Sequence, residues 1–320
     1  MERPDAELTI TAPDGREATI IVETKRRVDP KLVPVVTDQL RRYRETLDQP
    51  AGLVVSPFIS PRSRALLTGA GISYADGTGN LRLALEQPAL YIETSGASSD
   101  PWIVPGDRPL RSLKGPTAGR VVRALCDFRP PYGVEQLAKR SGTSLASVSR
   151  VFTFLDPDAL IVREPRGPVT QVKWAELIQR WAQDYAFARS NTTRTFLEPR
   201  GLTSLLDKLK AVDIPYAATG SLAAAQIAPI AAPRLAAIYI GDIDRAAQVL
   251  RLRRAETGGN VLLAEPFDTV AFERTWNKDG ITYAALSQVA VDLLTGPGRS
   301  PAEGEELLRW MQENEDAWRS

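Results

Sequence analysis

Three residues near the start of the chain could carry metal-dependent chemistry on phosphate esters. Asp5 follows Pro4, and Glu23 and Lys25 lie two positions apart in the same short segment. Cleavage of a phosphodiester needs carboxylates that converge on a divalent cation, with a nearby positive charge that orients water and stabilises the developing charge. Asp5 and Glu23 are therefore candidate metal ligands, and all three residues are candidate catalytic residues.

Two strands joined by a turn would position these side chains. The segments AELTIT and ATIIVET flank Pro13-Asp14-Gly15, which predicts a β-hairpin. Residues two apart on a strand point to the same face, so Glu23 and Lys25 can reach one site. Asp5, on the neighbouring strand, can supply the second carboxylate.

A helix predicted from about Lys31 to Leu47 adds Gln39 and Tyr43 as candidate catalytic residues, because residues four apart share one helix face and can reach the same site. An apolar strand, GLVVSP, and a second helix near residues 60–69 follow. The order PD, ExK and QxxxY resembles the PD-(D/E)XK nuclease superfamily, and its QxxxY element resembles the RecB-like branch. The resemblance covers about residues 1–95 and implies a restriction-endonuclease-like α/β domain, with Mg²⁺ as cofactor if the domain is active.

In that superfamily a helix, often with a further acidic residue, precedes the first strand, whereas four residues precede Asp5 here. We therefore expect no cofactor and no cleavage, and a contribution to DNA or partner binding through Lys25, Arg26 and Arg27. One alternative is a metal-dependent endonuclease that uses Asp5 and Glu23. Another is that Glu23 and Lys25 are simply a surface pair at a strand end.

Residues 117–174 show the pattern of three short helices followed by two strands. Val121, Val122, Leu125 and Phe128 form an apolar stripe at helical spacing, and a second stripe contains Val134, Leu137 and Ala138. Gly142 tolerates positive φ in the turn that follows, and the hydroxyl of Thr143 or Ser144 can cap the next helix. That third helix is predicted to bury Val148, Val151, Phe152 and Leu155.

The other face of the third helix is small or hydrogen-bonding, which suits approach to base edges in a major groove. The strands LIVRE and TQVKW then flank a loop, residues 165–168, whose basic tip is placed to touch phosphates. The segment resembles the winged helix-turn-helix DNA-binding fold along its whole length. The alternative is a helical bundle with a hairpin that mediates protein contacts. The candidate DNA-binding residues are Ser144, Ser147, Ser149, Arg150, Thr153, Arg166 and Lys173.

Composition limits the remaining choices. The chain of 320 residues has a net charge of +1, so DNA affinity must come from local basic runs such as residues 25–27, 41–44 and 251–254. No histidine is present, which excludes catalytic triads that contain histidine and zinc sites with histidine ligands. The single Cys126, on an apolar helix face, is expected to be buried, and no internal disulfide can form. Without an apolar leader or an 18-residue apolar run, we expect a cytoplasmic protein that does not enter membranes.

Residues 188–320 mix predicted strands at 214–219, 235–241 and 260–266 with helices, one of them over residues 283–294. Gly220-Ser221 before a helix, and Asp242 with Asp244 after a strand, are also typical of nucleotidyltransferases. Asp244 is expected to cap a helix instead. Residues 117–320 resemble the abortive-infection type IV (AbiEi-like) antitoxins, which implies a transcriptional autoregulator opposed to a nucleotidyltransferase toxin.

The sequence thus predicts an α/β protein with a nuclease-like domain (1–95), a linker (96–116), a winged helix-turn-helix (117–187) and a C-terminal α/β domain (188–320). The C-terminal domain is antitoxin-like or a degenerate nucleotidyltransferase. The predicted function is a transcriptional regulator that binds double-stranded DNA sequence-specifically as a homodimer and controls a defence or toxin-antitoxin operon. The alternatives are a DNA endonuclease targeted by the winged helix and an antitoxin that acts by contact with a toxin protein.

Overall fold

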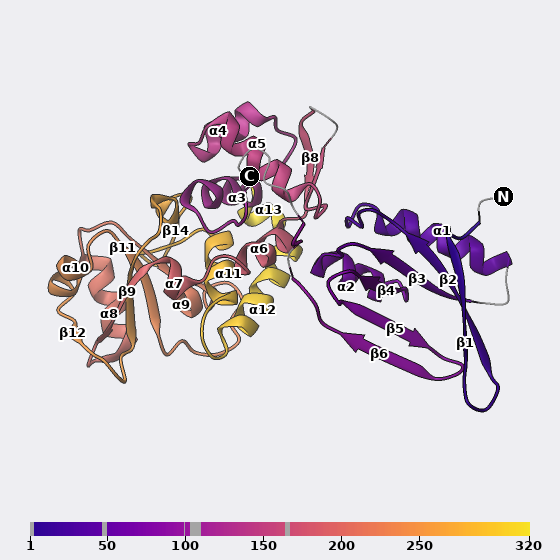
Figure 1. Ribbon diagram of the computed structural model, residues 1–320. Coiled ribbons are helices and arrows are strands. Elements are labelled where there is room, and N and C mark those ends of the chain that lie inside the picture. The colour runs from indigo at the N-terminus through magenta and orange to yellow at the C-terminus, as the bar shows by residue number, and fades with distance from the viewer. Residues whose placement is uncertain (1–2, 47–49, 99, 103–109, 164–166) are drawn as a thin grey trace. The chain divides into compact units, whose positions relative to one another are not determined.

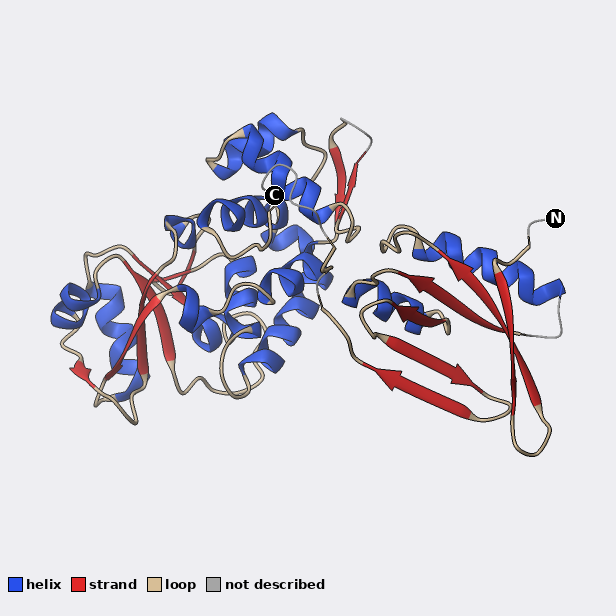
Figure 2. Ribbon diagram, viewed as in Figure 1, coloured by secondary structure: helices blue, strands red, loops and turns tan. Residues whose placement is uncertain are grey.

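The computed structural model describes residues 3–46, 50–98, 100–102, 110–163 and 167–320 (Figure 1). The chain divides into two compact units. The first contains Met1–Pro109 and Thr153–Ala159, and the second contains Leu110–Phe152 and Leu160–Ser320. Both mix helices with strands (Figure 2), which confirms the α/β class. The domain boundaries predicted from the sequence stay predictions.

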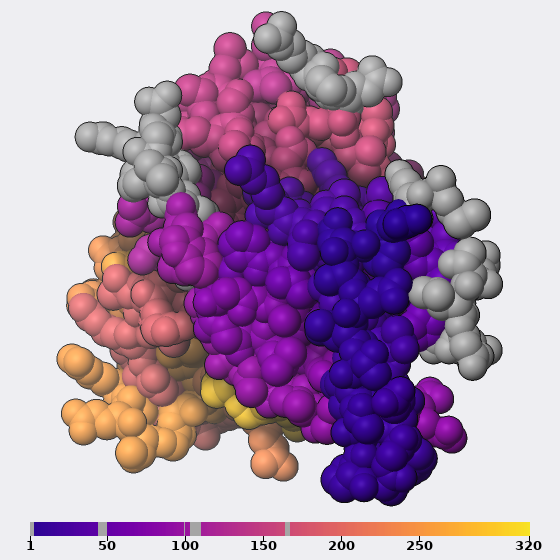
Figure 3. Space-filling model, turned by 45° about the vertical axis from the view of Figure 1, so that its right-hand side comes forward, coloured from indigo at the N-terminus to yellow at the C-terminus, as the bar shows by residue number. Residues whose placement is uncertain are grey.

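A six-stranded mixed sheet forms the first unit, in the order β1-β2-β3-β4-β5-β6. β2, β3 and β4 are parallel, and the outer strands join them antiparallel. The predicted hairpin is β1–β2, where Ala6 pairs with Val22 and Gly15 turns with a φ of 84° that favours glycine. Its tip projects from the body of the unit (Figure 3). The elements are β1 (Ala6–Thr11), β2 (Glu17–Thr24), α1 (Val33–Thr46), β3 (Ala51–Ser56), α2 (Pro61–Gly69), β4 (Ser73–Asp76), β5 (Leu81–Leu85) and β6 (Leu90–Thr94).

Strand alternation decides which residues of this sheet face its two helices. Ile21 and Val54 point to one face and pack with Leu40 of α1 and Leu67 of α2. The opposite face carries a smaller buried cluster of Ile20, Val22 and Leu53. The helix predicted at residues 31–47 and the one near residues 60–69 are confirmed as α1 and α2.

Three helices and a two-stranded hairpin open the second unit. The predicted stripes are confirmed, because Val121, Leu125, Leu137 and Val148 are fully buried. Phe128 and Val134 are the exceptions, since both are half-buried, and the guanidinium carbons of Arg140 and Arg274 each lie 4.6 Å from the ring centroid of Phe128. The elements are α3 (Pro116–Asp127), α4 (Val134–Ser141), α5 (Leu145–Leu155), β7 (Ile161–Arg163), β8 (Val169–Val172), α6 (Trp174–Ala182) and α7 (Phe187–Ser190).

The rest of the second unit is built on a seven-stranded sheet, in the order β12-β9-β13-β11-β10-β15-β14. Its strands are β9 (Thr192–Leu197), β10 (Tyr216–Thr219), β11 (Ala236–Ile240), β12 (Arg253–Arg254), β13 (Val261–Glu265), β14 (Trp276–Lys278) and β15 (Ile281–Tyr283). The remaining helices are α8 (Gly201–Ala211), α9 (Gly220–Ala224), α10 (Ile243–Val249), the 3₁₀ helix η1 (Thr269–Phe272), α11 (Leu286–Leu294), α12 (Ser300–Glu313) and α13 (Glu315–Trp318).

The strands predicted at residues 214–219, 235–241 and 260–266 are confirmed as β10, β11 and β13. The helix predicted over residues 283–294 is shorter than expected, because Tyr283 belongs to β15 and α11 begins at Leu286. Almost every residue of α11 is buried, since the helix packs against α3, α6, α9 and α12. α11 therefore connects the sheet with the helices that open this unit.

Candidate functional site

The turn between α4 and α5 has the geometry that its sequence predicts. Gly142 adopts a left-handed φ of 59°, and the Ser141 hydroxyl lies 2.8 Å from that of Thr143. Ser144, rather than Thr143, supplies the cap, because its Oγ accepts a hydrogen bond of 3.2 Å from the backbone N–H of Ser147. The start of α5 is therefore fixed by side chains of the turn itself.

The exposed face of α5 carries Ser149, Arg150 and Thr153 beside the small Ala146. Ser147 corrects the expectation for this face, since the residue is only 8% exposed. Its Oγ lies 2.9 Å from that of Ser144 and accepts a hydrogen bond of 3.3 Å from Nη2 of Arg150. As the third residue of the helix, Ser147 turns back toward the cap and leaves Arg150 as the cation of this face.

The hairpin after α5 contains the two predicted strands, with a register shift between Val162 and Arg163. The Arg163 guanidinium carbon lies 5.2 Å from the ring centroid of Phe152, which joins the hairpin to α5. Lys173 is half-buried at the start of α6, and its backbone N–H donates to the Leu160 carbonyl. Arg166 lies outside the described residues.

In the first unit, four of the five predicted catalytic residues form one hydrogen-bonded cluster. Glu23 is 3% exposed, and its Oε1 accepts from Nζ of Lys25 and, at 3.0 Å, from Nε2 of Gln39. Gln39 also donates to the Tyr43 hydroxyl at 2.9 Å, and that hydroxyl donates to the Arg3 carbonyl at 3.1 Å. Oε2 of Glu23 is buried and has no hydrogen-bond partner among the described residues.

Asp5 has a different set of partners from this cluster. Its Oδ2 accepts hydrogen bonds from the backbone N–H and the hydroxyl of Thr24, both at 2.7 Å. These bonds lower the pKa of Asp5 because they stabilise its charged form. Within the described residues, no group of three or more Asp, Glu, Cys or His side chains could hold a metal ion.

The residues that suggested nucleotidyl transfer have structural partners. The Ser221 hydroxyl donates to Oε2 of Glu303 on α12. Asp242 is the cap of α10, since its Oδ1 accepts from the backbone N–H of Arg245 at 2.9 Å. Asp244, which we expected to be the cap, lies in the first turn and pairs instead with Arg194 at 2.5 Å.

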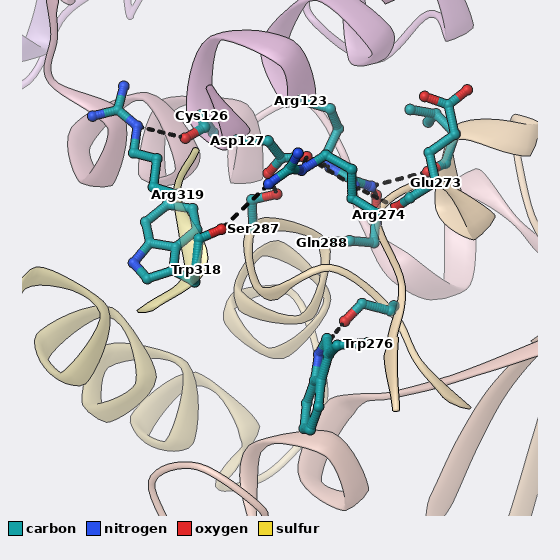
Figure 4. A network of polar contacts seen from close by, with 12 residues as sticks. Arg123, Cys126, Asp127, Glu273, Arg274, Trp276, Ser287, Gln288, Trp318 and Arg319 are labelled. Atoms are coloured by element: carbon teal, nitrogen blue, oxygen red, sulfur yellow. Dashed lines mark hydrogen bonds and ion pairs between the residues drawn. The ribbon is translucent and has the colours of Figure 1, made fainter. Parts of the chain in front are cut away.

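A buried network that the sequence did not predict joins α3 to the sheet-containing part of the unit (Figure 4). Arg123 is 1% exposed. Its guanidinium donates to Oδ2 of Asp127, to Oε1 of Gln288 and to the carbonyls of Val270 and Glu273, all at 3.0–3.1 Å. The only sequence signal was the spacing of Arg123 and Asp127, which suits a pair on one helix face.

Gln288 links this network to the buried carboxylate of Asp292. Its Nε2 donates to Oδ1 of Asp292 at 2.9 Å, and Asp292 also accepts from the hydroxyls of Tyr185, Tyr239 and Thr219 at 2.6–2.8 Å. Burial raises the pKa of Asp292 to about 6 despite these four donors. A continuous polar chain thus runs from α3 to the centre of the second unit.

Cys126 confirms the expectation of a buried thiol. Burial raises the pKa of its Sγ–H, so the thiolate that would be reactive is disfavoured. The neighbouring backbone carbonyl of Cys126 accepts a hydrogen bond of 2.8 Å from Arg319, close to the end of the chain. The residue therefore belongs to the packing of α3.

Comparison with known proteins places a family match on the second unit. Residues 171–302 match a family model described as "Transcriptional regulator, AbiEi antitoxin, Type IV TA system". The resemblance of the chain to the AbiEi-like antitoxins is thereby confirmed over that segment, which begins in β8 and ends in α12. No curated protein and no solved structure matches the chain. None of the helices in the described ranges is long and apolar enough to cross a membrane.

Proposed function

We propose that this chain is a double-stranded DNA-binding transcriptional regulator of a toxin-antitoxin operon, with α3–α5 and the β7–β8 hairpin acting as a winged helix-turn-helix. The observation that carries the proposal is α5. It follows a glycine turn, is capped by Ser144, and exposes Ser149 and Arg150 beside the small Ala146. Such a face can approach base edges closely, and the family description of residues 171–302 supports the regulatory role.

In this proposal Arg150 reads sequence, and the hairpin contacts phosphates. A guanidinium placed on O6 and N7 of guanine discriminates against the wrong base by about 1–3 kcal/mol. Arg150→Ala should therefore weaken binding to the DNA upstream of the chain's own gene by roughly 5- to 150-fold. Arg309, which is exposed on α12 and paired with Glu306, offers a matched control as Arg309→Ala.

Fluorescence anisotropy with the upstream duplex and a scrambled duplex tests this directly. The wild type should prefer the upstream duplex, Arg150→Ala should lose most of that preference, and Arg309→Ala should keep it. Equal affinity of the wild type and Arg150→Ala for the upstream duplex would reject α5 as the reading helix.

The family description also names an antitoxin, so a second candidate function is neutralisation of a toxin. The two functions separate in cells that carry the toxin gene encoded beside this one. If neutralisation uses protein contact, Arg150→Ala should relieve repression and still protect the cells. Loss of both properties together would show that protection depends on DNA binding.

We propose that the first unit binds DNA or a partner and does not cleave DNA. Oε1 of Glu23 accepts from Lys25 and Gln39, and Oδ2 of Asp5 accepts from Thr24; within the described residues no third Asp, Glu, Cys or His side chain completes a metal-binding group with these two carboxylates. Magnesium bound by so few carboxylates is held weakly unless substrate phosphates complete its shell. Incubation of duplex and single-stranded DNA with Mg²⁺ or Mn²⁺ should give no products. Metal-dependent cleavage that disappears in Glu23→Gln would make the nuclease the better account.

A further inference from the structure

The edge strand β12 and the two residues that lead into it carry the arginine run 251–254, at one end of the second unit (Figure 1). Arg251, Arg253 and Arg254 are exposed, and Leu252 between them is half-buried. β12 pairs with β9, where Arg253 lies opposite Leu197 and Arg254 opposite Phe196, so the two side chains point to opposite faces of the sheet. We call these three arginines the basic edge.

Arg251 occupies a backbone position that favours glycine. It follows α10 with a φ of 51°, its N–H donates to the Gln248 carbonyl, and the next N–H, of Leu252, donates to the Ala247 carbonyl. This pair of hydrogen bonds is the Schellman ending of a helix, in which the left-handed residue is usually glycine because a Cβ is strained there. An arginine at this position therefore costs local stability relative to glycine.

The three guanidinium groups form no ion pair within the described residues. Arginines elsewhere commonly have an acidic partner, as in Arg16–Asp14 and Arg309–Glu306. Near the basic edge, Asp244 is taken by Arg194 and Asp242 caps α10. The exposed Glu256 is the remaining neighbouring acid in sequence, and no contact joins it to these arginines. The basic edge thus presents uncompensated positive charge.

Protection of an unpaired strand edge by charge would account for Arg253 and Arg254. It does not account for Arg251, which lies outside β12 and would cap α10 better as glycine. Guanidinium groups bind phosphate oxygens through paired N–H donors, which lysine cannot do. Protein interfaces are enriched in arginine too, but together with aromatic residues at their centre. The run contains three arginines and no aromatic residue, so it fits phosphates better than a protein surface.

We propose that the basic edge binds the phosphate backbone of duplex DNA outside the base pairs read by α5. The inference adds a contact to the proposed function and rests on it. β12 lies at the end of the second unit away from α4 and α5 (Figure 1), so the contact requires DNA longer than the recognition site, or a bend in it. The contribution is independent of sequence because phosphates carry no base information.

The salt dependence of binding to a random-sequence duplex of about 60 base pairs, roughly six helical turns, tests the proposal. Each phosphate contact contributes about 0.9 to the slope of log K against log salt. Arg251→Gly should lower the slope by about one, and the double variant Arg253→Ser, Arg254→Ser by about two. The double variant Arg16→Ser, Arg309→Ser removes the same charge from exposed, paired sites and should leave the slope unchanged.

Thermal unfolding separates this effect from damage to the fold. Arg251→Gly relieves the left-handed strain, so its Tm should equal or exceed that of the wild type while DNA binding weakens. Unchanged slopes in both basic-edge variants would overturn the proposal. The arginines would then protect the strand edge or bind an acidic protein partner. The preference for the chain's own upstream DNA over random DNA should survive in these variants and fall in Arg150→Ala. The experiments therefore distinguish an error in the role proposed for the basic edge from an error in the role proposed for α5.

Discussion

Replacement of Asp292 by asparagine should remove a pH dependence of stability that the buried polar chain creates. The carboxyl is fully enclosed, and burial raises its pKa from an ordinary 3.8 to about 6. Burial and the nearby carboxylate hold the pKa values of Tyr185 and Tyr239 well above 10, so both hydroxyls remain donors across this range. Asparagine keeps one acceptor oxygen for these donors and cannot ionise.

A group whose folded pKa is raised binds more protons in the folded than in the unfolded state between the two pKa values. The stability it contributes is therefore complete below pH 3.8 and is lost as pH rises through about 6. With 1.36 kcal/mol for each pKa unit, the full shift corresponds to about 3 kcal/mol. About 2 kcal/mol of it should be lost between roughly pH 4.5 and 7.5.

Urea unfolding of the wild type and Asp292→Asn, repeated across this pH range, measures the effect. As pH rises, the unfolding free energy of the wild type should fall by about 2 kcal/mol relative to that of Asp292→Asn. Taking the difference cancels the carboxyls whose pKa values are lowered in both proteins, such as Glu198 and Asp76. A difference that stays constant with pH would refute the interpretation of Asp292 as a buried, titrating carboxyl.

Three further predictions concern the second unit and the assembly. Arg123→Met should destabilise the fold by about 3–5 kcal/mol in urea unfolding, because it removes the nearest cation from the buried Asp127 carboxylate and leaves it the Ser287 hydroxyl and Arg274 at 3.8 Å, whereas Arg120→Met, at a partly exposed ion pair, should cost about 1 kcal/mol or less. Equal losses of stability in Arg123→Met and Arg120→Met would contradict the role given to the buried network. Gly119→Ala should lower stability by about 1–3 kcal/mol, because its Cβ would lie 2.8 Å from the Phe267 ring, whereas Gly69→Ala meets nothing within 4 Å. A gain in stability at Gly119 would show that the ring can move aside. Sedimentation should show a homodimer, since two copies double the phosphate contacts on a two-fold operator, and a monomer bound singly to its operator would count against it.

The elements that the sequence predicted are those whose signal is local. The apolar stripe at Val121 and Leu125, the glycine turn at Gly142 and the hairpin at Gly15 each depend on residues a few positions apart. The match over residues 171–302 likewise agrees with the antitoxin resemblance that the sequence carried. Local spacing was therefore sufficient for much of the helical part and for the first hairpin.

The features that the sequence did not predict depend on partners far along the chain. Arg123 lies among apolar residues of α3, and its burial is compensated by Gln288, 165 positions away. The two-residue strand β12 has no periodicity of its own and exists only through pairing with β9. Such contacts become visible only when the tertiary structure is known. Ser147 is a different case, because its partners Ser144 and Arg150 are local, and its place four residues before the buried Val151 already indicated a position at the edge of the buried face.

In the function proposed above, Arg150 on α5 reads a guanine in the DNA upstream of this chain's gene. Replacing each guanine of that duplex in turn by 7-deazaguanine removes the N7 acceptor without changing base pairing. At one position the wild type should lose roughly fivefold or more in affinity, consistent with about 1 kcal/mol, while Arg150→Ala should lose almost nothing there. If the same substitutions weaken both proteins equally at every position, Arg150 reads no guanine, and α5 is not the recognition helix proposed here.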